Sequence, residues 1–121
     1  MVRKRIIAVD FDGTITDGDF PRVGTAQPHA FEVMKELQEA GHQLILNTCR
    51  ENDGFKISKQ YLTDAVDFCK DNGIEFRSVN ETHIEDEFRP NGGRKVYADI
   101  YIDDRNLGGF PGWLEVRKML L

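Results

Sequence analysis

The sequence predicts an α/β fold with a mainly parallel sheet of about four to five strands, and three observations support it. Short apolar runs alternate with segments of helical periodicity. The first run, within residues 5–10, is almost continuously apolar, which is typical of a strand covered on both faces. Gly41 and Gly73 follow the first two helical segments, and glycine commonly ends a helix. This alternation implies parallel strands joined by right-handed crossovers.

The pattern places each element on the chain. The expected strands are residues 5–10, 43–48, 74–80 and 99–104. The expected helices lie within residues 29–42, from about residue 57 to residue 72, and after Pro111, which suits a first helical turn. The side chains at helical spacing in the first helix are Phe31, Met34, Leu37 and Gln38. Those expected to face inward in the second are Ile57, Tyr61, Leu62, Ala65, Phe68 and Cys69. Residues 80–95 are polar and irregular.

The composition indicates one domain, residues 1–121, because 121 residues with 40% hydrophobic and 31% charged side chains are close to the commonest domain size. A net charge of −5 and an isoelectric point near 5.2 weigh against a non-specific nucleic-acid-binding protein. No apolar run reaches the roughly 18 residues of a membrane span, and the run before Asp10 is too short for a secretory signal. We therefore expect a cytoplasmic protein. Cys49 and Cys69 lack metal-ligand spacing and are expected to be reduced thiols, with Cys69 in the core.

Two aspartates stand at the end of the first predicted strand, in the stretch IIAVDFDGTIT. Asp12 and Gly13 alone are typical of a turn. Asp10 needs another explanation, because it stands at the apolar end of the strand, where a carboxylate is costly to desolvate. Residues two apart in an extended segment point to the same side, so Asp10 and Asp12 are expected to converge. Carboxylates held that close need a cation or a shared proton.

Polar side chains also follow the other predicted strands. Asn47 and Thr48 end the second strand, Asp103 and Asp104 end the fourth, and Lys95 lies a few residues before the fourth. Because the carboxyl ends of parallel strands meet at one edge of the sheet, we expect these groups to lie near the two aspartates of the first strand. Carboxylate oxygens suit Mg²⁺, which would also offset the repulsion between the acids.

Together these residues resemble the haloacid dehalogenase superfamily, whose members are mostly phosphatases. The stretch DFDGTIT looks like the first motif of that superfamily, Thr48 after QLILN like the second, Lys95 like the third and YIDD like the fourth. The resemblance covers nearly the whole chain. It implies a three-layer α/β/α, Rossmann-like fold and a Mg²⁺-dependent phosphatase.

The resemblance also implies a role for each motif residue. Asp10 is expected to be the nucleophile that forms an aspartyl-phosphate intermediate, and Asp12 the general acid and base. Thr48 is expected to donate a hydrogen bond to the phosphoryl group of the substrate, and Lys95 to offset its charge. Arg94 is the alternative to Lys95.

The implied magnesium ligands are the Asp10 carboxylate, the Asp12 backbone carbonyl and one acid of the fourth motif. Asp104 is preferred, because it takes the place of the aspartate in the superfamily's commoner Gly-Asp form of this motif. Asp103 is the alternative ligand.

The chain has no room for the cap domain of larger superfamily members. Residues 14–28 leave space only for a small flap, and residues 49–94 are taken up by a helix, a strand and a loop. An open site favours either a large substrate that carries a terminal phosphate or a second subunit that closes the pocket. The expected partner is a small-molecule or terminal phosphate ester. The flap and the loop at residues 80–94 are the expected specificity elements, with Phe20 and Phe88 as candidate contacts.

Other polar residues have weaker signals. Arg50 and Arg105 follow strand ends and could bind a second anionic group of the substrate, although exposed loop arginines are as often without a role. His29, His42 and His83 share no metal-ligand spacing and are expected to be surface or capping residues.

Two other functions stay open. A receiver-like phospho-aspartate signalling domain would also cluster acids, a threonine and a lysine around magnesium. Its adjacent acids typically stand at the first strand, whereas here they end the last, which argues against it. The other alternative is a catalytically idle relative that binds phosphorylated ligands, and turnover would exclude it.

Overall fold

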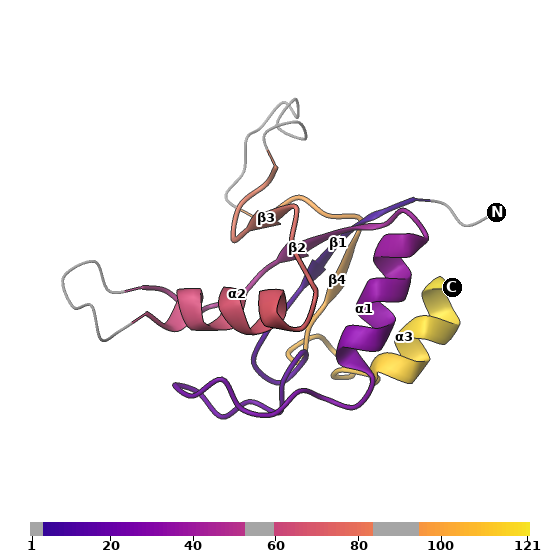
Figure 1. Cartoon of the computed structure of the whole chain (residues 1–121). Coiled ribbons are helices and arrows are strands. Elements are labelled where there is room, and N and C mark those ends of the chain that lie inside the picture. Colours follow the sequence, from indigo (N-terminus) through magenta and orange to yellow (C-terminus); the bar gives the residue numbers. More distant parts are fainter. Residues whose placement is uncertain (1–3, 53–59, 84–94) are drawn as a thin grey trace.

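A parallel sheet forms the centre of the protein (Figure 1). The computed structural model describes residues 4–52, 60–83 and 95–121. The strands of these residues are all parallel and lie in the order β3-β2-β1-β4. Their bounds are β1 (Ile6–Val9), β2 (Gln43–Leu46), β3 (Ser78–Val79) and β4 (Ile100–Ile102). The predicted α/β fold with a parallel sheet is confirmed.

The part of the chain that the structure describes forms three helices, α1 (Ala30–Glu39), α2 (Tyr61–Asp71) and α3 (Trp113–Leu120). The buried side chains of α1 are Ala30, Val33, Met34 and Leu37, which form one apolar stripe at helical spacing. α1 and α3 lie side by side, and Arg117 of α3 pairs with Glu36 of α1. None of these helices has the length and apolar character needed to cross a membrane.

The third strand is shorter than predicted. It was expected at residues 74–80, but β3 contains only Ser78–Val79. The Ile74 N–H still bonds the Cys69 carbonyl at the end of α2, so the chain there has not yet become extended. The ladder to β2 begins only where the Arg77 N–H bonds the Leu44 carbonyl.

The helix starts also differ from the prediction. α3 begins at Trp113 rather than at Pro111, because Gly112 has a φ of 97°, outside the helical region. The described part of α2 begins at Tyr61. The predicted start near Ile57 lies outside the described residues.

The two faces of the sheet are covered differently. One face packs against all three described helices, through Ile7, Val9, Leu44 and Leu46. The other carries Ala8 and Ile45, which pack with Val96, Ala98 and Tyr101. Within the described ranges no helix covers this second face, so the predicted three-layer arrangement is not seen there. Residues 84–94, between β3 and β4, lie outside these ranges.

The strand order creates a crevice beside β1. The chain runs from β1 outward to β2 and β3, then returns to place β4 on the other side of β1. The Asp10 N–H continues this pairing by bonding the Ile102 carbonyl over 2.9 Å. Parallel sheets bind ligands beyond the carboxyl ends of their strands at such a reversal of strand order. A ligand site is therefore expected at the ends of β1 and β4.

Away from that edge, the structure corrects the prediction for His42 and confirms the prediction for Cys69. His42, expected at the surface, is only 3% exposed, and its Nδ1 accepts a hydrogen bond from the Arg5 N–H. It lies between the end of α1 and the first residue of β2, where Arg5 of the N-terminal segment contacts it. Cys69 is buried in the core as predicted, and burial raises the pKa of its thiol to about 12.

Candidate active site

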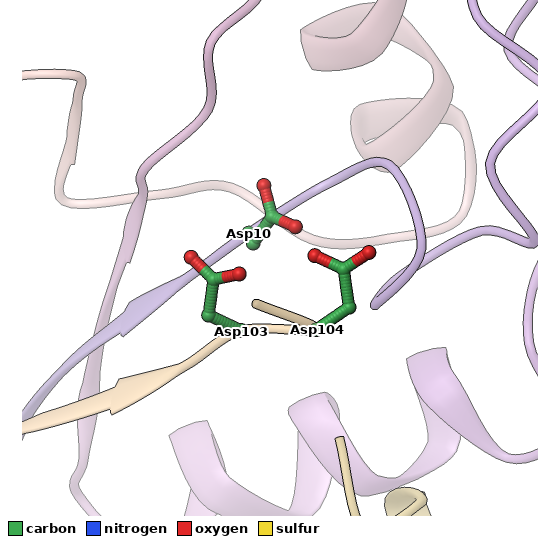
Figure 2. Close-up of side chains that lie close together, drawn as sticks. All are labelled: Asp10, Asp103 and Asp104. Carbon is green, nitrogen blue, oxygen red and sulfur yellow. The ribbon is translucent and has the colours of Figure 1, made fainter. Parts of the chain in front are cut away.

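Three aspartates meet where β1 and β4 end (Figure 2). Asp10 follows β1, and Asp103 and Asp104 follow β4. One carboxylate oxygen from each lies within 4.8 Å of the others. The structure thus shows the predicted convergence of the first and fourth motifs. Asp103 and Asp104 both point toward Asp10.

This crowding changes the ionisation of Asp10. Burial of its carboxyl raises its pKa from 3.8 to about 7, and the neighbouring carboxylates of Asp103 and Asp104 add to the increase. A divalent cation placed among the three groups would offset this repulsion. The donors are hard carboxylate oxygens, which Mg²⁺ prefers. The described residues therefore fit the magnesium site that the sequence predicted.

The turn after β1 is shaped to let Asp104 approach. The Phe11 carbonyl accepts hydrogen bonds from the N–H groups of Ile15 and Thr16, which closes one tight turn. Gly13 in this turn has a φ of +83°, and a Cβ there would lie 2.1 Å from Asp104 Oδ2. Only glycine combines that backbone angle with that space. The first motif therefore has glycine at this position because Asp104 occupies the space that a Cβ would need.

The core holds the same turn in place. The Thr14 hydroxyl lies 3.3 Å from Asp10 Oδ2, to which it donates a hydrogen bond. The indole N–H of Trp113, which is fully buried, donates to the Thr14 carbonyl over 2.8 Å. α3 thus supports the turn that carries the first motif, from 99 residues away along the chain.

Thr48 stands at the same edge, as expected. It lines a cleft of about 460 Å³ together with Asp10, Asp103 and Asp104. Its N–H donates to Asn80 Oδ1 over 2.7 Å, and its hydroxyl oxygen accepts from the Arg50 N–H over 3.1 Å. A hydroxyl that accepts a hydrogen bond keeps its own O–H, which it can donate to a phosphoryl oxygen.

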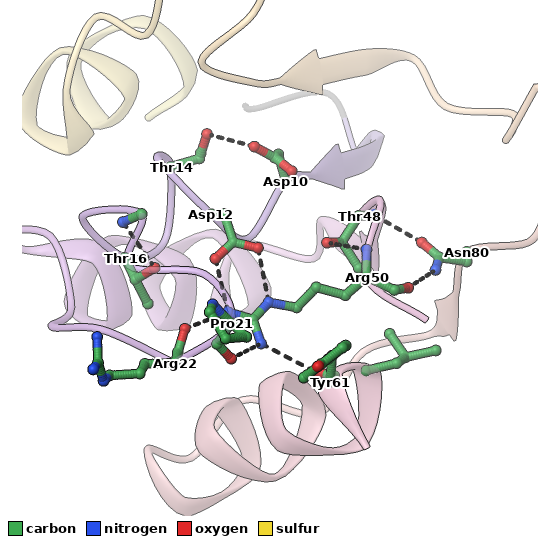
Figure 3. A network of polar contacts seen from close by, with 12 residues as sticks. Asp10, Asp12, Thr14, Thr16, Pro21, Arg22, Thr48, Arg50, Tyr61 and Asn80 are labelled. Carbon is green, nitrogen blue, oxygen red and sulfur yellow. Dashed lines mark hydrogen bonds and ion pairs between the residues drawn. The ribbon is translucent and has the colours of Figure 1, made fainter. Parts of the chain in front are cut away.

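Asp12 does not join the three acids. Its carboxylate is held by Arg50, whose Nε lies 2.7 Å from Asp12 Oδ2 and whose Nη2 lies 2.8 Å from Oδ1 (Figure 3). This two-pronged pair is the strongest geometry for arginine and carboxylate. The Arg50 side chain is 1% exposed and that of Asp12 is 26% exposed.

The structure corrects the expectation that Arg50 is an exposed loop residue that binds substrate. Its remaining N–H groups donate to the carbonyl oxygens of Pro21, Arg22 and Tyr61. With the two bonds to Asp12, all five N–H donors of the guanidinium are used. Arg50 therefore has no donor left for an anion bound in the cleft.

Comparison with known proteins places the chain in a family. No family model and no curated protein matches it. The solved structure of a conserved protein from Bacteroides thetaiotaomicron is similar, with 40% sequence identity and a TM-score of 0.83. The similarity covers 97% of this chain and 89% of the Bacteroides chain. This chain belongs to the same family as that protein. The shared family establishes the fold.

The basic residues expected near the acids line two neighbouring cavities. Lys95 lines a neighbouring cavity of about 530 Å³, which shares Thr48 and Asp103 with the first. Its Nζ lies 4.6 Å from the centroid of the Tyr101 ring. Arg105 is exposed and lines the acid cleft. Arg94, the alternative to Lys95, lies outside the described residues.

The predicted flap is present as a small hairpin between the first motif and α1. The Asp17 N–H bonds the Thr25 carbonyl, and the Gln27 N–H bonds the Ile15 carbonyl. Phe20 at its tip is 56% exposed and lines the cleft. Phe88, the other candidate contact, lies outside the described residues.

Sequence reasoning missed Asn80. This residue follows β3, has a φ of 56°, and donates its side-chain amide to the Arg50 carbonyl as well as accepting from Thr48. It therefore fixes the loop that carries both residues. Its position at the end of the third strand was the available signal, since asparagine tolerates the left-handed conformation better than most residues.

Proposed function

We propose that this protein is a capless member of the haloacid dehalogenase superfamily and a Mg²⁺-dependent phosphatase. The observation that carries the proposal is the meeting of Asp10, Asp103 and Asp104 at the reversal of strand order. Thr48 lines the same cleft, and the tight turn at Gly13 brings the first and fourth motifs into contact.

In this proposal the three acids have different tasks. The side chains of Asp10 and Asp104 would hold Mg²⁺, with Asp103 beside them. The cation would neutralise negative charge on the acids and on the phosphoryl group. Asp10 attacks phosphorus and forms an aspartyl phosphate, which water then hydrolyses. Thr48 donates a hydrogen bond to a phosphoryl oxygen. A role for Lys95 in offsetting phosphoryl charge stays a prediction, since it lines the adjacent cavity.

A second function has one observation in its favour. Because Arg50 occupies both oxygens of Asp12, the protein could bind phosphorylated ligands without turning them over. The two functions differ in whether phosphate is released.

Phosphate release from an aryl phosphate tests the proposal. We expect turnover with magnesium, none with EDTA, and none in Asp10→Asn. Asp67→Asn makes the same charge change at an exposed position of α2 and should keep full activity. Tight binding of magnesium and a phosphate mimic, without release of phosphate from any ester tested, would support the binding protein instead.

A further inference from the structure

Phe20 is an exposed aromatic residue that lines the acid cleft, the cavity that contains the three aspartates. Of the exposed large apolar side chains in the described parts of the chain, it alone lines this cleft. The others, Leu107, Leu114, Met119 and Leu121, belong to the C-terminal segment after β4. Single exposed apolar residues are common on protein surfaces, so the surroundings of this ring decide whether it has a role.

The Phe20 ring is held in place although it is exposed. Arg50 Cζ lies 5.1 Å from the centroid of this ring, and the Tyr61 ring packs edge-to-face against it with 5.1 Å between centroids. Arg50, whose side chain is buried, also donates hydrogen bonds to the carbonyl oxygens of Pro21 and Arg22, the two residues that follow Phe20 (Figure 3). The flap is therefore tied to the core beside the ring. A ring that is already fixed loses little conformational freedom when a ligand binds it.

One face of the Phe20 ring is left for a ligand. Arg50 lies over one face, and more than half of the residue is still exposed. Aromatic rings pair best when they are offset-stacked or edge-to-face, with centroids about 4.5–7 Å apart. Phe20 therefore fits a flat aromatic ring better than a chain of hydroxyl groups, which would lose hydrogen bonds to water against an apolar surface.

The flap residues that line the cleft include no cation. Besides Phe20, they are Asp17 and Gly18. Arg50, the cation that contacts the ring, has all five N–H donors bound within the protein. Arg105 also lines the cleft, but it follows β4. A second anionic group beside the ring would meet the Asp17 carboxylate without a matching donor from the flap, so this side of the cleft favours an uncharged group.

The cleft has room for such a group in addition to the phosphoryl group. Its volume of about 460 Å³ lies within the range of pockets that hold whole small molecules, about 300–1,000 Å³. We propose that Phe20 is a specificity residue that stacks on the leaving group, so that the preferred substrates are phosphate monoesters whose leaving group carries an uncharged aromatic ring. This inference rests on the proposed phosphatase function, and it concerns the part of the substrate that the acids and Thr48 do not bind.

A pair of phosphonates tests the proposal without requiring turnover. Benzylphosphonate and cyclohexylmethylphosphonate are similar in size and charge, but only the first has an aromatic ring. In calorimetric titration with Mg²⁺ present, we expect benzylphosphonate to bind about fivefold more tightly, the gain typical of one aromatic pair. Equal affinities, or no binding of either compound, would overturn the inference, even in a protein that hydrolyses phosphate esters. Tighter binding of benzylphosphonate without phosphate release from any ester would remove the phosphatase and retain the aromatic site.

Phe20→Leu keeps an apolar side chain and removes the ring. The preference for benzylphosphonate should disappear, and the ratio of kcat/KM for benzyl phosphate to that for acetyl phosphate should fall about fivefold. The fall should come from a higher KM for benzyl phosphate, because stacking stabilises the bound substrate and the transition state alike. Phe31→Leu makes the same exchange on α1, where Phe31 packs on Phe68 outside the cleft, and should leave the preference unchanged.

A purely structural role for Phe20 gives a different result. If the ring only keeps Arg50 in place, Phe20→Leu would lower the rates for benzyl and acetyl phosphate by the same factor, and the preference for benzylphosphonate would persist. That result would overturn the inference. If Phe20→Leu does not fold, the affinities of the wild-type protein for the two phosphonates still decide.

Discussion

Replacing Gly13 with alanine should lower both the free energy of unfolding and the affinity for Mg²⁺, and a matched control distinguishes the two effects. The added Cβ would lie 2.1 Å from Asp104 Oδ2 and 2.8 Å from its Cγ. Those atoms are the exposed end of a side chain, so Asp104 can turn away at little cost. The φ of +83° remains, and an alanine there costs about 1–2 kcal/mol. We therefore expect a modest loss of stability, together with displacement of one acid from the cluster.

Gly108→Ala is the matched control. Gly108 has a φ of +90°, and a Cβ there meets no atom within 4 Å. It should lose the same free energy of unfolding as Gly13→Ala, about 1–2 kcal/mol, without disturbing Asp104. Urea denaturation in EDTA measures that common cost.

Calorimetric titration with MgCl₂ then measures the difference between the two variants. Gly108→Ala should bind Mg²⁺ with the wild-type affinity, and Gly13→Ala about 10–100-fold more weakly, the loss expected when the surroundings of a metal site are displaced. Equal affinities in the two variants would refute the assignment of Asp104 as a ligand.

The remaining predictions concern stability. In EDTA at pH 8, Asp10→Asn should be more stable than the wild type. The pKa of Asp10 in the folded protein is about 7 against an ordinary 3.8, so ionisation weakens the fold as pH rises between these values. The full difference corresponds to about 4 kcal/mol, which solvent screening at this half-exposed group reduces to about 1–2 kcal/mol. Thermal melts should show no such gain in Asp67→Asn, and a gain that persists in saturating Mg²⁺ would contradict the cause given. Arg50→Met should lower the free energy of unfolding by about 3–5 kcal/mol, because it leaves Asp12 without its charge partner. Urea denaturation measures this loss, and a midpoint equal to that of the wild type would contradict the ion pair. Trp113→Phe should lower the free energy of unfolding by about 1–3 kcal/mol, because the Thr14 carbonyl loses its donor. A loss under about 0.5 kcal/mol in urea denaturation would argue against that hydrogen bond.

The first and fourth motifs could be predicted from the sequence because their positions follow from simple rules. An apolar run that ends in two acids marks a strand and its carboxyl end, and parallel strands bring such ends together. The alternation of strands and helices predicts that Asp10, Asp103 and Asp104 share one edge of the sheet, and the strand order β3-β2-β1-β4 places them next to one another. Gly13 could also be assigned to a turn, although its closeness to Asp104 required coordinates.

The setting of Arg50 could not be predicted in this way. A loop arginine is ordinarily solvated, and its partner Asp12 is 38 residues away along the chain. Its burial depends on the flap, whose carbonyls at Pro21 and Arg22 have no sequence signature. The late start of β3 could not be predicted either. The Ile74 N–H bonds the Cys69 carbonyl at the end of α2, and a backbone bond of this kind can be made by almost any residue, so it leaves no signal in the sequence.

Detection of a phosphate group on Asp10 tests the central claim most directly. The protein is mixed with Mg²⁺ and acetyl phosphate, quenched within milliseconds to seconds, and reduced with borohydride, which converts an aspartyl phosphate to homoserine. Mass spectrometry of the peptide that carries residue 10 should find homoserine at that position, and none when Mg²⁺ is withheld. Aspartate that remains unmodified while phosphate is released, or homoserine at residue 103 or 104 instead, would contradict the assignment of Asp10 as the nucleophile.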